Sequence, residues 1–443
     1  MVVRVTASGP ARPEAGDRPA RRWSGRPRRG RGEALSAYRV RMRASVPTRG
    51  DAAGLAAGAA LVAAALLPVL AGRPRALDPI DLVVYRTGGQ SIVHGWALYT
   101  PAFLQHSGGH LPFTYPPFAA IALSPFALLP LRAVYASWSV LCLLALWALV
   151  RLSFSELLAR LPAGRRTLAV AALTAAAAAT VPVAEHLTLG QVGIPLTLMC
   201  VADVVPAATR WPRGVLVGLA AAVKLTPGLF VVYFLVTRQW RAATTAAGTT
   251  AAAWVLAALV RPSDSRTYFL DGVGFDPHRA GAVLAVANQS LWGTFHRWLG
   301  SGAEVAWLAS ATLVAVVGLY RARQAERAGN RLAAAALVGV TSLLVSPVSW
   351  MHSGVWLIPA LAALVGAGRD QRRVVAAAGV WVVLMFVAPH PPPSTASGAA
   401  AWFETYVLHE AMVYVYLAVL LFLPVAGQRR ARTTYPSMTA ART

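Results

Sequence analysis

Charged residues are scarce in this chain, and their scarcity limits what the protein can be. Only 13% of the 443 residues are charged, 56% are hydrophobic, and the mean hydropathy is +0.53. A soluble enzyme carries roughly twice that share of charge, about 25%. Apolar runs recur at lengths near those needed to cross a bilayer, where a backbone must satisfy its own hydrogen bonds. The composition therefore predicts an all-α polytopic membrane protein and excludes an ordinary soluble enzyme.

Cysteine and lysine are nearly absent as well. The two cysteines, Cys142 and Cys200, both lie in apolar runs, which argues against a disulfide framework or a metal cluster. Lys224 is the single lysine, so arginine supplies nearly all the positive charge behind the formal net charge of +24. The arginines are confined to an N-terminal tail and to short segments between apolar runs. This distribution is typical of the positive-inside pattern, and it requires no nucleic acid partner.

The chain divides into a basic tail, a membrane domain and a short C-terminal tail. Residues 1–50 are rich in Arg, Pro and Gly, and we expect a disordered cytosolic segment there. The first apolar run follows this polar tail, so we expect an uncleaved first span rather than a signal peptide. Residues 51–428 form the expected membrane domain, and residues 429–443 form a cytosolic tail. We expect about twelve spans, at 53–72, 134–150, 167–184, 192–208, 214–223, 226–237, 242–260, 304–320, 332–346, 353–367, 374–388 and 408–426.

Arginine clusters give these spans one consistent topology. We expect a multi-pass protein of the plasma membrane with both termini in the cytosol. The opposite, extracytoplasmic face then receives the segments 73–133, 185–191, 261–303, 347–352 and 389–407. Segment 114–130 is apolar but is interrupted by four prolines. We interpret it as a juxtamembrane or re-entrant element that could guide a lipid tail, because a full span there would place the arginines that follow on the outer face.

A proline-containing break separates the short apolar segments 214–223 and 226–237. Lys224 and Pro227 lie at this break, and proline cannot continue a helix without losing a hydrogen bond. We expect the chain to turn there near the outer side, where free backbone amides can face an anionic group. The alternative, one long kinked span, would place Arg238 outside.

The stretch 78–117 follows the first expected span and is too polar to cross a bilayer, so we expect a loop against the membrane. Asp81 is its strongest candidate for a catalytic base, because a carboxylate there can take a proton from a sugar hydroxyl. The alternatives are a helix cap or a solvated charge, and Asp78 fits a cap better. Tyr85 and Tyr115 of the same stretch are candidates for contacts with a sugar.

Several basic residues could hold an anionic ligand. Lys224 lies between apolar runs, where an unpaired ammonium group is costly, so we expect a partner such as a lipid phosphate; snorkelling to the interface is the alternative. His352 could hold a phosphate or a sugar hydroxyl, or could bond a loop carbonyl. Arg266 and Arg279 could add bidentate phosphate contacts. The same segment, 261–303, carries three acidic residues that are alternative bases or metal ligands: Asp264, Asp271 and Asp276.

Other polar residues fall on the same expected face. His186 and Gln191 flank the expected turn 185–191, where Gln191 could bond a sugar hydroxyl or cap the next helix. Asn288 and Gln289 carry amides that could recognise hydroxyls, and Trp292 offers a stacking surface for a sugar ring. The sequence has no DxD motif, which disfavours a nucleotide-sugar enzyme with a bound metal, and we predict no metal site and no cofactor.

Seven collinear segments carry a resemblance to a known family. They are DLVVYRTGG (81–89), GWALYTP (95–101), LPFTYPPFAAIALSPFALLP (111–130), LGQVGIPLTL (189–198), GLAAAVKLTPGLFVVYFL (218–235), ANQSLWG (287–293) and SPVSWMHSGVWLIP (346–359). Taken together they resemble the actinobacterial polyprenol-phosphate-mannose-dependent α-1,2-mannosyltransferases, glycosyltransferase family 87 of the GT-C fold. The resemblance implies a polyprenyl-phosphate sugar donor, mannose as the sugar, and an active site that faces away from the cytosol. It also places the family's catalytic aspartate on Asp81 and its late histidine on His352, whereas Ser353 stands where some relatives have a second histidine.

This reading favours a mechanism with a single base. A polyprenyl phosphate is a good leaving group, so it needs charge stabilisation rather than the general acid of glycoside hydrolysis. Asp81 would deprotonate the acceptor's 2-hydroxyl, which attacks the anomeric carbon opposite the phosphate and inverts the configuration. The acceptor could be a phosphoinositol mannoside, a lipoglycan or another lipid-linked glycan. The competing hypotheses are a transporter or flippase for a lipid-linked sugar, which predicts an inverted repeat that we do not find, and a non-catalytic membrane assembly subunit.

Overall fold

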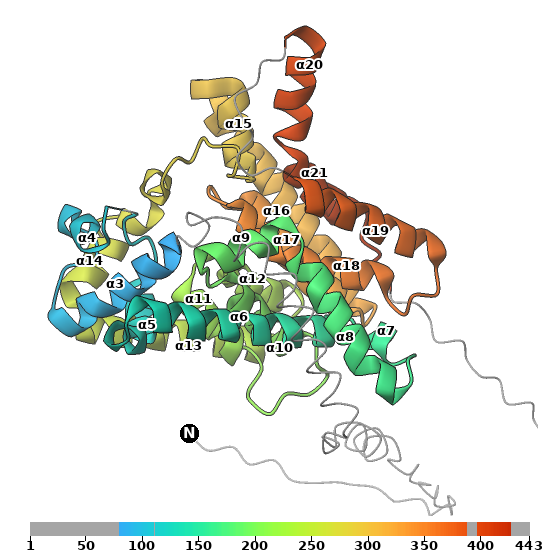
Figure 1. The fold of residues 1–443 in the computed structure, drawn as a ribbon, viewed down its shortest axis with the longest axis horizontal. Helices are drawn as coiled ribbons and strands as arrows, with labels where there is room; N and C mark the ends of the chain where they lie inside the picture. The colour runs from blue at the N-terminus through green and yellow to red at the C-terminus, as the bar shows by residue number, and fades with distance from the viewer. Residues whose placement is uncertain (1–78, 110, 388–396, 427–443) are drawn as a thin grey trace, which may run out of the picture. The chain divides into compact units, whose positions relative to one another are not determined.

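The computed structural model describes residues 79–109, 111–387 and 397–426, and every regular element among them is helical (Figure 1). The β-type pairing in this part of the chain is an isolated bridge between Asn288 and Trp350. The predicted all-α class is therefore confirmed for the described residues. The first expected span, 53–72, and both expected tails lie outside them.

The elements follow one another with short connections. The first group is α3 (Ile80–His94), α4 (Pro101–His106), α5 (Pro117–Leu123), the 3-10 helix η1 (Ser124–Leu128), α6 (Leu131–Ser153), α7 (Ser155–Leu158), α8 (Ala163–Ala178) and α9 (Val181–Leu189). The second group is α10 (Gly193–Val204), α11 (Val215–Val223), η2 (Thr226–Gly228), α12 (Leu229–Val236), α13 (Trp240–Val260), α14 (Pro262–Phe269), η3 (Val273–Phe275), η4 (Pro277–Ala280) and α15 (Leu291–Leu299). The third group is η5 (Gly300–Gly302), α16 (Ala303–Arg327), α17 (Arg331–Val345), η6 (Met351–Trp356), α18 (Leu357–Val365), α19 (Gln371–Phe386), α20 (Gly398–Phe403), the π-helical turn η7 (Glu404–Leu408) and α21 (Ala411–Phe422).

Several of these helices are apolar and long enough to cross a membrane. In the described part of the chain, three helical runs qualify by length and composition: α6, α13 and the run from α15 through η5 to α16. Two bent pairs add to them if each pair is one span, namely α8 with α9, bent by 80°, and α20–η7 with α21, bent by 51°. Shorter apolar helices, α10 and α17 among them, pack between these. The expected number of about twelve spans stays a prediction.

Two regions that we expected to be loops are helical instead. The stretch 78–117 contains α3 and α4, because Leu82, Val84 and Tyr85 bury one face of α3 even though the segment is too polar for a bilayer. The expected turn at 185–191 is also wrong. The chain bends earlier, between α8 and α9, and α9 then continues to Leu189.

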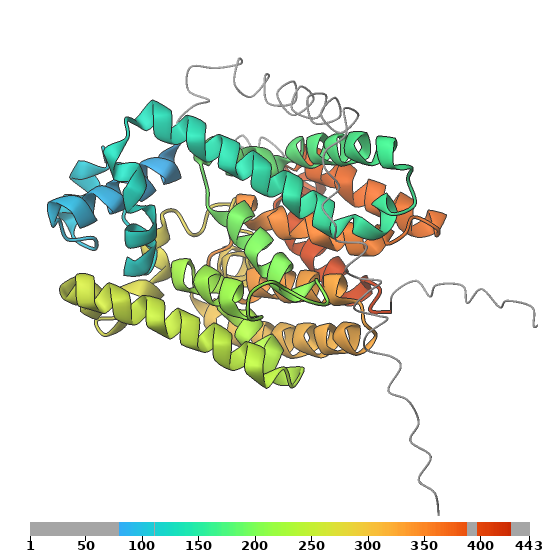
Figure 2. The same cartoon turned by 90° about the horizontal axis from the view of Figure 1, so that it is seen from below.

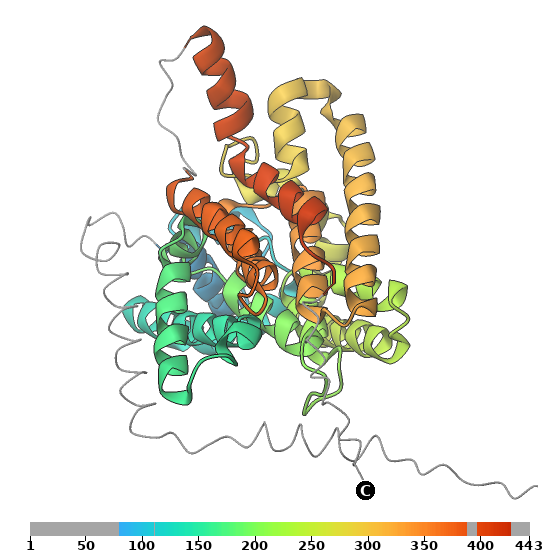
Figure 3. The same ribbon diagram turned by 90° about the vertical axis from the view of Figure 1, so that its right-hand side faces the viewer.

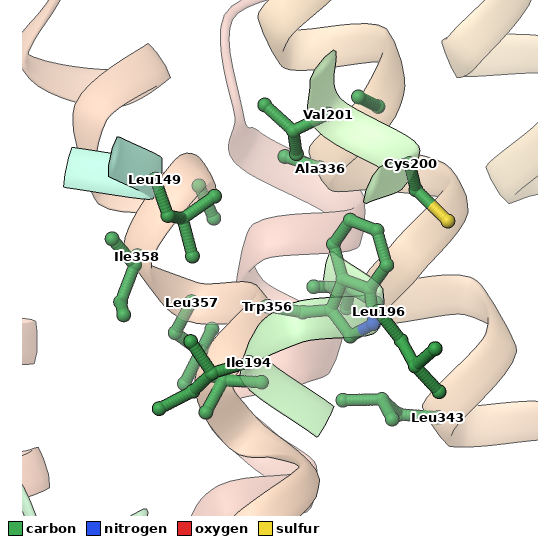
Figure 4. Close-up of a cluster of buried hydrophobic side chains, with 14 of the residues drawn as sticks. Leu149, Ile194, Leu196, Cys200, Val201, Ala336, Leu343, Trp356, Leu357 and Ile358 are labelled. Atoms are coloured by element: carbon green, nitrogen blue, oxygen red, sulfur yellow. The ribbon is translucent and has the colours of Figure 1, made fainter. Parts of the chain in front are cut away.

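The core of the bundle is organised around α17. All its side chains from Ala333 to Leu344 are buried, and it packs against α16, α18 and α21 (Figure 3). Small residues on α17 let neighbouring groups approach closely, as is common between membrane helices. Figure 4 shows part of this core, where Trp356 of η6 lies near Leu196 of α10.

Two further packing arrangements position the candidate site. Helices α6, α10, α11 and α13 pack one against the next, so α6 and α13 lie on opposite sides of α10 and α11 (Figure 2). A separate cluster of buried aromatic and aliphatic side chains joins α3, α4, α5 and α14. Asp264 of α14 accepts a hydrogen bond from the Leu98 amide at 3.0 Å and pairs with Arg261 Nε at 2.7 Å. These contacts hold the segment between α3 and α4 against the start of α14.

The contact between Gly339 of α17 and Trp356 gives a test of this core. A Cβ at Gly339 would lie 2.1 Å from ring atoms of Trp356. Gly339→Ala should therefore force the indole aside and destabilise the fold by about 1–3 kcal/mol, the usual cost of overpacking. The measurement is the melting temperature in detergent. Gly379→Ala in α19 is the control, because a Cβ there meets nothing within 4 Å. Equal melting temperatures for the two variants would contradict the packing described.

Candidate active site

Asp81 lies in the first turn of α3, where its negative charge faces the positive end of the helix dipole. Two glycines let α3 rest closely on its neighbours. A Cβ at Gly88 would lie 2.6 Å from the Phe113 ring, and a Cβ at Gly89 would lie 2.9 Å from the carbonyl oxygen of Leu123. Helix α3 therefore packs directly on α5, and this packing fixes the position of Asp81.

Tyr85, Tyr115 and Gln191 form a hydrogen-bonded cluster beside Asp81. Tyr85 Oη donates to Gln191 Oε1 at 2.9 Å and lies 2.7 Å from Tyr115 Oη, which itself lies 3.4 Å from Gln191 Oε1. The carbonyl of Gln191 accepts from the Trp138 indole at 3.2 Å, which holds its backbone. Since Oε1 is engaged by tyrosines, the amide nitrogen serves the hydrogen bond to Asp81. The structure thus brings three of the predicted sugar-binding residues together with the predicted base.

Lys224 reaches this cluster from the break between α11 and η2. Helix α11 ends at Val223, and Lys224 has an extended backbone with φ −143° and ψ 135°, so the predicted break is confirmed. Its Nζ lies 5.7 Å from the centroid of the Tyr115 ring, within the range of a cation–π attraction. Its charge also interacts with that of Asp81. The single lysine and the candidate base therefore belong to one site.

The surroundings raise the pKa of Asp81 to about 6. Burial is the largest cause, because it removes hydration from the charged carboxylate. The hydrogen bond from Gln191 and the positive charge of Lys224 oppose it and keep the pKa from rising further. Helix α3 is not among the candidate membrane spans. A carboxylate with a pKa close to physiological pH can be ionised and still accept a proton readily, as a general base must.

A cavity of about 270 Å³ opens beside this cluster. Lys224 and Tyr115 line it together with Tyr268 of α14, Arg279 of η4 and Trp350 of the segment before η6. The lining is therefore assembled from parts of the chain that are far apart in sequence. It combines two cations with aromatic surfaces, which suits a ligand that has both an anionic group and a sugar ring.

The two candidate arginines differ in their surroundings. Arg279 lines the cavity, and its Nε is buried with no hydrogen-bond partner among the described residues, so it retains a donor for an anion. The side chain of Arg266 is 75% exposed and lies 4.0 Å from Asp271. Arg266 does not belong to the lining of the cavity. The structure therefore brings Arg279, and not Arg266, to the site with Lys224.

Buried histidines and a glutamate lie next to Asp81 and Lys224. His186 Nε2 accepts a hydrogen bond from the Ile194 amide at 2.8 Å, which joins α9 to α10. His352 is 4% exposed, and within the described ranges neither of its ring nitrogens has a hydrogen-bond partner. Its position is close enough to Lys224 for their charges to interact. His352 therefore has unused hydrogen-bonding capacity beside the candidate phosphate site.

Glu185 lies close to Asp81, although we assigned it no role from the sequence. It lies in α9, its charge interacts with that of Asp81, and its Oε2 is buried without a partner in the described part of the chain. The available signal was a carboxylate in an otherwise apolar segment, because such residues are costly in membrane proteins and usually functional.

Asn288 and Gln289 have their amides engaged by backbone groups. Asn288 donates to the carbonyls of Val283 and Pro347 at 2.9 and 3.1 Å, and accepts from the Ser349 amide at 2.9 Å. Gln289 donates to the carbonyl of His409 at 2.7 Å. These bonds hold the segment before η6, which supplies Trp350 and His352. We therefore interpret the two amides as supports of the site rather than as the hydroxyl contacts that we expected.

Trp292 and the remaining acidic candidates also have partners in the fold. Trp292 is buried and stacks on His296 with ring centroids 3.8 Å apart. Asp264 accepts from the Leu98 amide and pairs with Arg261, and Asp276 accepts from the His278 amide at 3.0 Å at the start of η4. Within the described ranges, no group of three or more His, Cys, Asp or Glu side chains is placed to hold a metal ion. Asp81 therefore remains the best-placed base.

Comparison with known proteins supplies the family. The model of glycosyltransferase family 87 matches residues 113–347. A polyprenol-phosphate-mannose-dependent alpha-(1-2)-phosphatidylinositol mannoside mannosyltransferase of Mycobacterium tuberculosis is 33% identical over 365 residues, covering 79% of this chain and 84% of the relative. The protein of the same description from Mycolicibacterium smegmatis is 33% identical over 364 residues, with 74% and 82% coverage.

A further relative is the polyprenol-phosphate-mannose-dependent alpha-(1-2)-phosphatidylinositol pentamannoside mannosyltransferase of Mycolicibacterium smegmatis. It is 37% identical over 291 residues, which cover 65% of this chain and 69% of the relative. No solved structure matches this chain significantly. The family match spans the segments that carry Tyr115, Gln191 and Lys224, so it includes much of the site described above. The chain belongs to glycosyltransferase family 87 and is a membrane glycosyltransferase.

Proposed function

We propose that this enzyme transfers mannose from a polyprenyl-phosphate mannose donor to a hydroxyl of a phosphatidylinositol mannoside, with Asp81 as the general base. The relatives named for this donor and acceptor class, which cover most of the chain, support the two substrates. The observation that carries the chemical assignment is the interaction of Asp81 with Lys224 at the edge of a cavity that also receives Arg279. A base and a phosphate site are the two parts that this transfer needs.

The reaction follows from the bonds that change. The acceptor oxygen gives its proton to the Asp81 carboxylate and forms a bond to the anomeric carbon of mannose. The bond between that carbon and the phosphate oxygen breaks, and polyprenyl phosphate leaves with its electron pair. Lys224, Arg279 and His352 neutralise or bond the leaving phosphate, so no general acid is needed. A direct displacement with one base inverts the configuration at the anomeric carbon, which gives an α linkage from a β-linked donor.

The orientation of the site in the membrane is part of the proposal. Arg331 donates to the Pro206 carbonyl at 3.2 Å and lies 3.3 Å from Glu326, which accepts from Tyr233 Oη at 2.8 Å. These contacts gather the arginine-bearing ends of α10, α12, α16 and α17. The opposite ends of α10, α11 and α17 lead to Gln191, Lys224 and the segment before His352. Under the positive-inside rule, this arrangement supports an extracytoplasmic site and cytosolic termini.

Replacement of the base gives the most direct test. Asp81→Asn keeps the size of the side chain but cannot accept the proton, so the transfer rate should fall about 10²–10⁴-fold. The measurement is incorporation of radiolabelled mannose from polyprenyl-phosphate mannose into phosphatidylinositol mannosides by purified protein. Asp271→Asn, at an exposed carboxylate outside the cavity, is the matched control. Near wild-type transfer by Asp81→Asn, at an unchanged melting temperature, would exclude Asp81 as the base.

The pH dependence of the reaction tests the environment of Asp81. Since the raised pKa is about 6, kcat/KM for the donor should rise tenfold per pH unit below that value and level off above it, because only the ionised carboxylate accepts a proton. Rates are measured between pH 4.5 and 8 with donor well below its KM. An acid limb centred near pH 4, the usual range of an exposed aspartate, would contradict the buried setting described here.

The phosphate site predicts a change in donor affinity. Lys224→Met removes a charge-assisted hydrogen bond worth about 1.5–3 kcal/mol, so the KM for the donor should rise about ten- to hundredfold. The same change removes a positive charge that lowers the pKa of Asp81, so the acid limb should shift to higher pH. Arg241→Met, at an exposed arginine on the opposite end of the bundle, is the control. An unchanged donor KM in Lys224→Met would remove Lys224 from the phosphate site.

A further inference from the structure

An apolar groove of about 250 Å³ lies between α13 and the broken pair formed by α11 and α12. Leu225, Gly228 and Val231 form one wall, and Ala247 and Ala251 of α13 contribute to the other. Gly228 has no side chain to enter the groove, and the space beside it is open, because a Cβ there would meet nothing within 4 Å. The groove therefore has room that its own side chains do not fill.

The lining offers a ligand carbon atoms and almost no hydrogen-bonding groups. Its polar side chains are Thr250 and Trp254, and both are already engaged. Thr250 Oγ1 donates to the Gly218 carbonyl at 2.9 Å, and the Trp254 indole donates to the Ala222 carbonyl at 3.3 Å. A sugar or a phosphate would lose its hydrogen bonds to water on entering such a groove, which costs on the order of several kcal/mol. Only a hydrocarbon chain fits this chemistry.

Leu225 connects this groove to the candidate active site. Its side chain lines both the groove and the cavity that contains Lys224 and Arg279. A molecule with its phosphate at Lys224 therefore has the groove as the adjoining path for an attached apolar tail. We propose that the groove binds the first isoprene units of the donor's polyprenyl tail, an inference that rests on the proposed function and extends it to the lipid.

The groove differs from the path that we expected for the tail. Segment 114–130 was the expected guide, and its helix α5 packs against α11 and α13. None of the residues of α5 lines the groove, which is bounded by α11, η2, α12 and α13. Because lipid tails are as apolar as the groove, the tail gains little hydrophobic energy by leaving the bilayer. The groove acts by orientation, since a tail held in it directs the phosphate at Lys224.

Two substitutions that fill the groove from opposite walls test this proposal. Gly228→Phe and Ala251→Phe are assayed with two donors, the mannosyl phosphates of a long polyprenol and of citronellol. We expect kcat/KM for the long-chain donor to fall about tenfold in both variants, because a displaced tail misplaces the phosphate. The value for the citronellyl donor should change less than twofold. Gly248→Phe and Ala252→Phe, exposed positions of α13 outside the groove, are matched controls and should behave as wild type.

The possible outcomes separate this inference from the proposed function. Equal losses with both donors would mean that the variants disturb the phosphate site, and no loss with either donor would mean that a phospholipid acyl chain or nothing occupies the groove. A loss shared by the two controls would assign the effect to the bilayer-facing surface of α13. Each of these results overturns the tail site. Failure of the wild-type enzyme to use either donor would instead overturn the proposed function.

Discussion

The opposed charges of Asp81 and Lys224 are the interaction on which the site depends. Each comes from a different part of the chain, and each is partly removed from water, so neither would keep its charge cheaply alone. Their attraction favours the charged form of each. A donor phosphate bound at Lys224 would offset the positive charge that lowers the pKa of Asp81. Donor binding would then make Asp81 more basic at the moment when the acceptor must lose its proton.

Interruptions of the helices bring these charges together. Lys224 lies where α11 stops, Gln191 follows the end of α9, and His352 lies in the 3-10 turn η6 ahead of α18. At each interruption, backbone and side-chain polar groups leave the regular helical pattern and need other partners. Some are satisfied within the fold, as for His186 and the Ile194 amide, and others are left facing the site. The helix breaks therefore supply the polar groups of the candidate active site in an otherwise apolar bundle.

The sequence predicted the parts of this arrangement that follow from unusual residues. One lysine in 443 residues and a following proline were sufficient to predict both a break and a site at Lys224. The hydrophobicity pattern led us to expect a loop where α3 lies. Low hydrophobicity excludes a bilayer span, but it does not exclude a helix that buries one face. The sequence also does not distinguish an amide that recognises a hydroxyl from one that supports a loop, and the amides of Asn288 and Gln289 bond loop carbonyls in the structure. Spatial grouping, as for Glu185 beside Asp81, requires the packing of α9 and is not visible in a linear pattern.

The distribution of charge also assigns the donor phosphate and the acceptor sugar to different parts of the proposed site. The leaving phosphate is drawn to Lys224 and Arg279, which line one cavity. Glu185 would repel a phosphate. Its Oε2 and the hydroxyl of the nearby Tyr416 are both buried without hydrogen-bond partners among the described residues. Sugar hydroxyls can donate to the carboxylate and accept from the phenol, so they satisfy such groups without a charge conflict. Asp81 interacts with both Lys224 and Glu185, so it lies where an acceptor hydroxyl and a donor phosphate can meet.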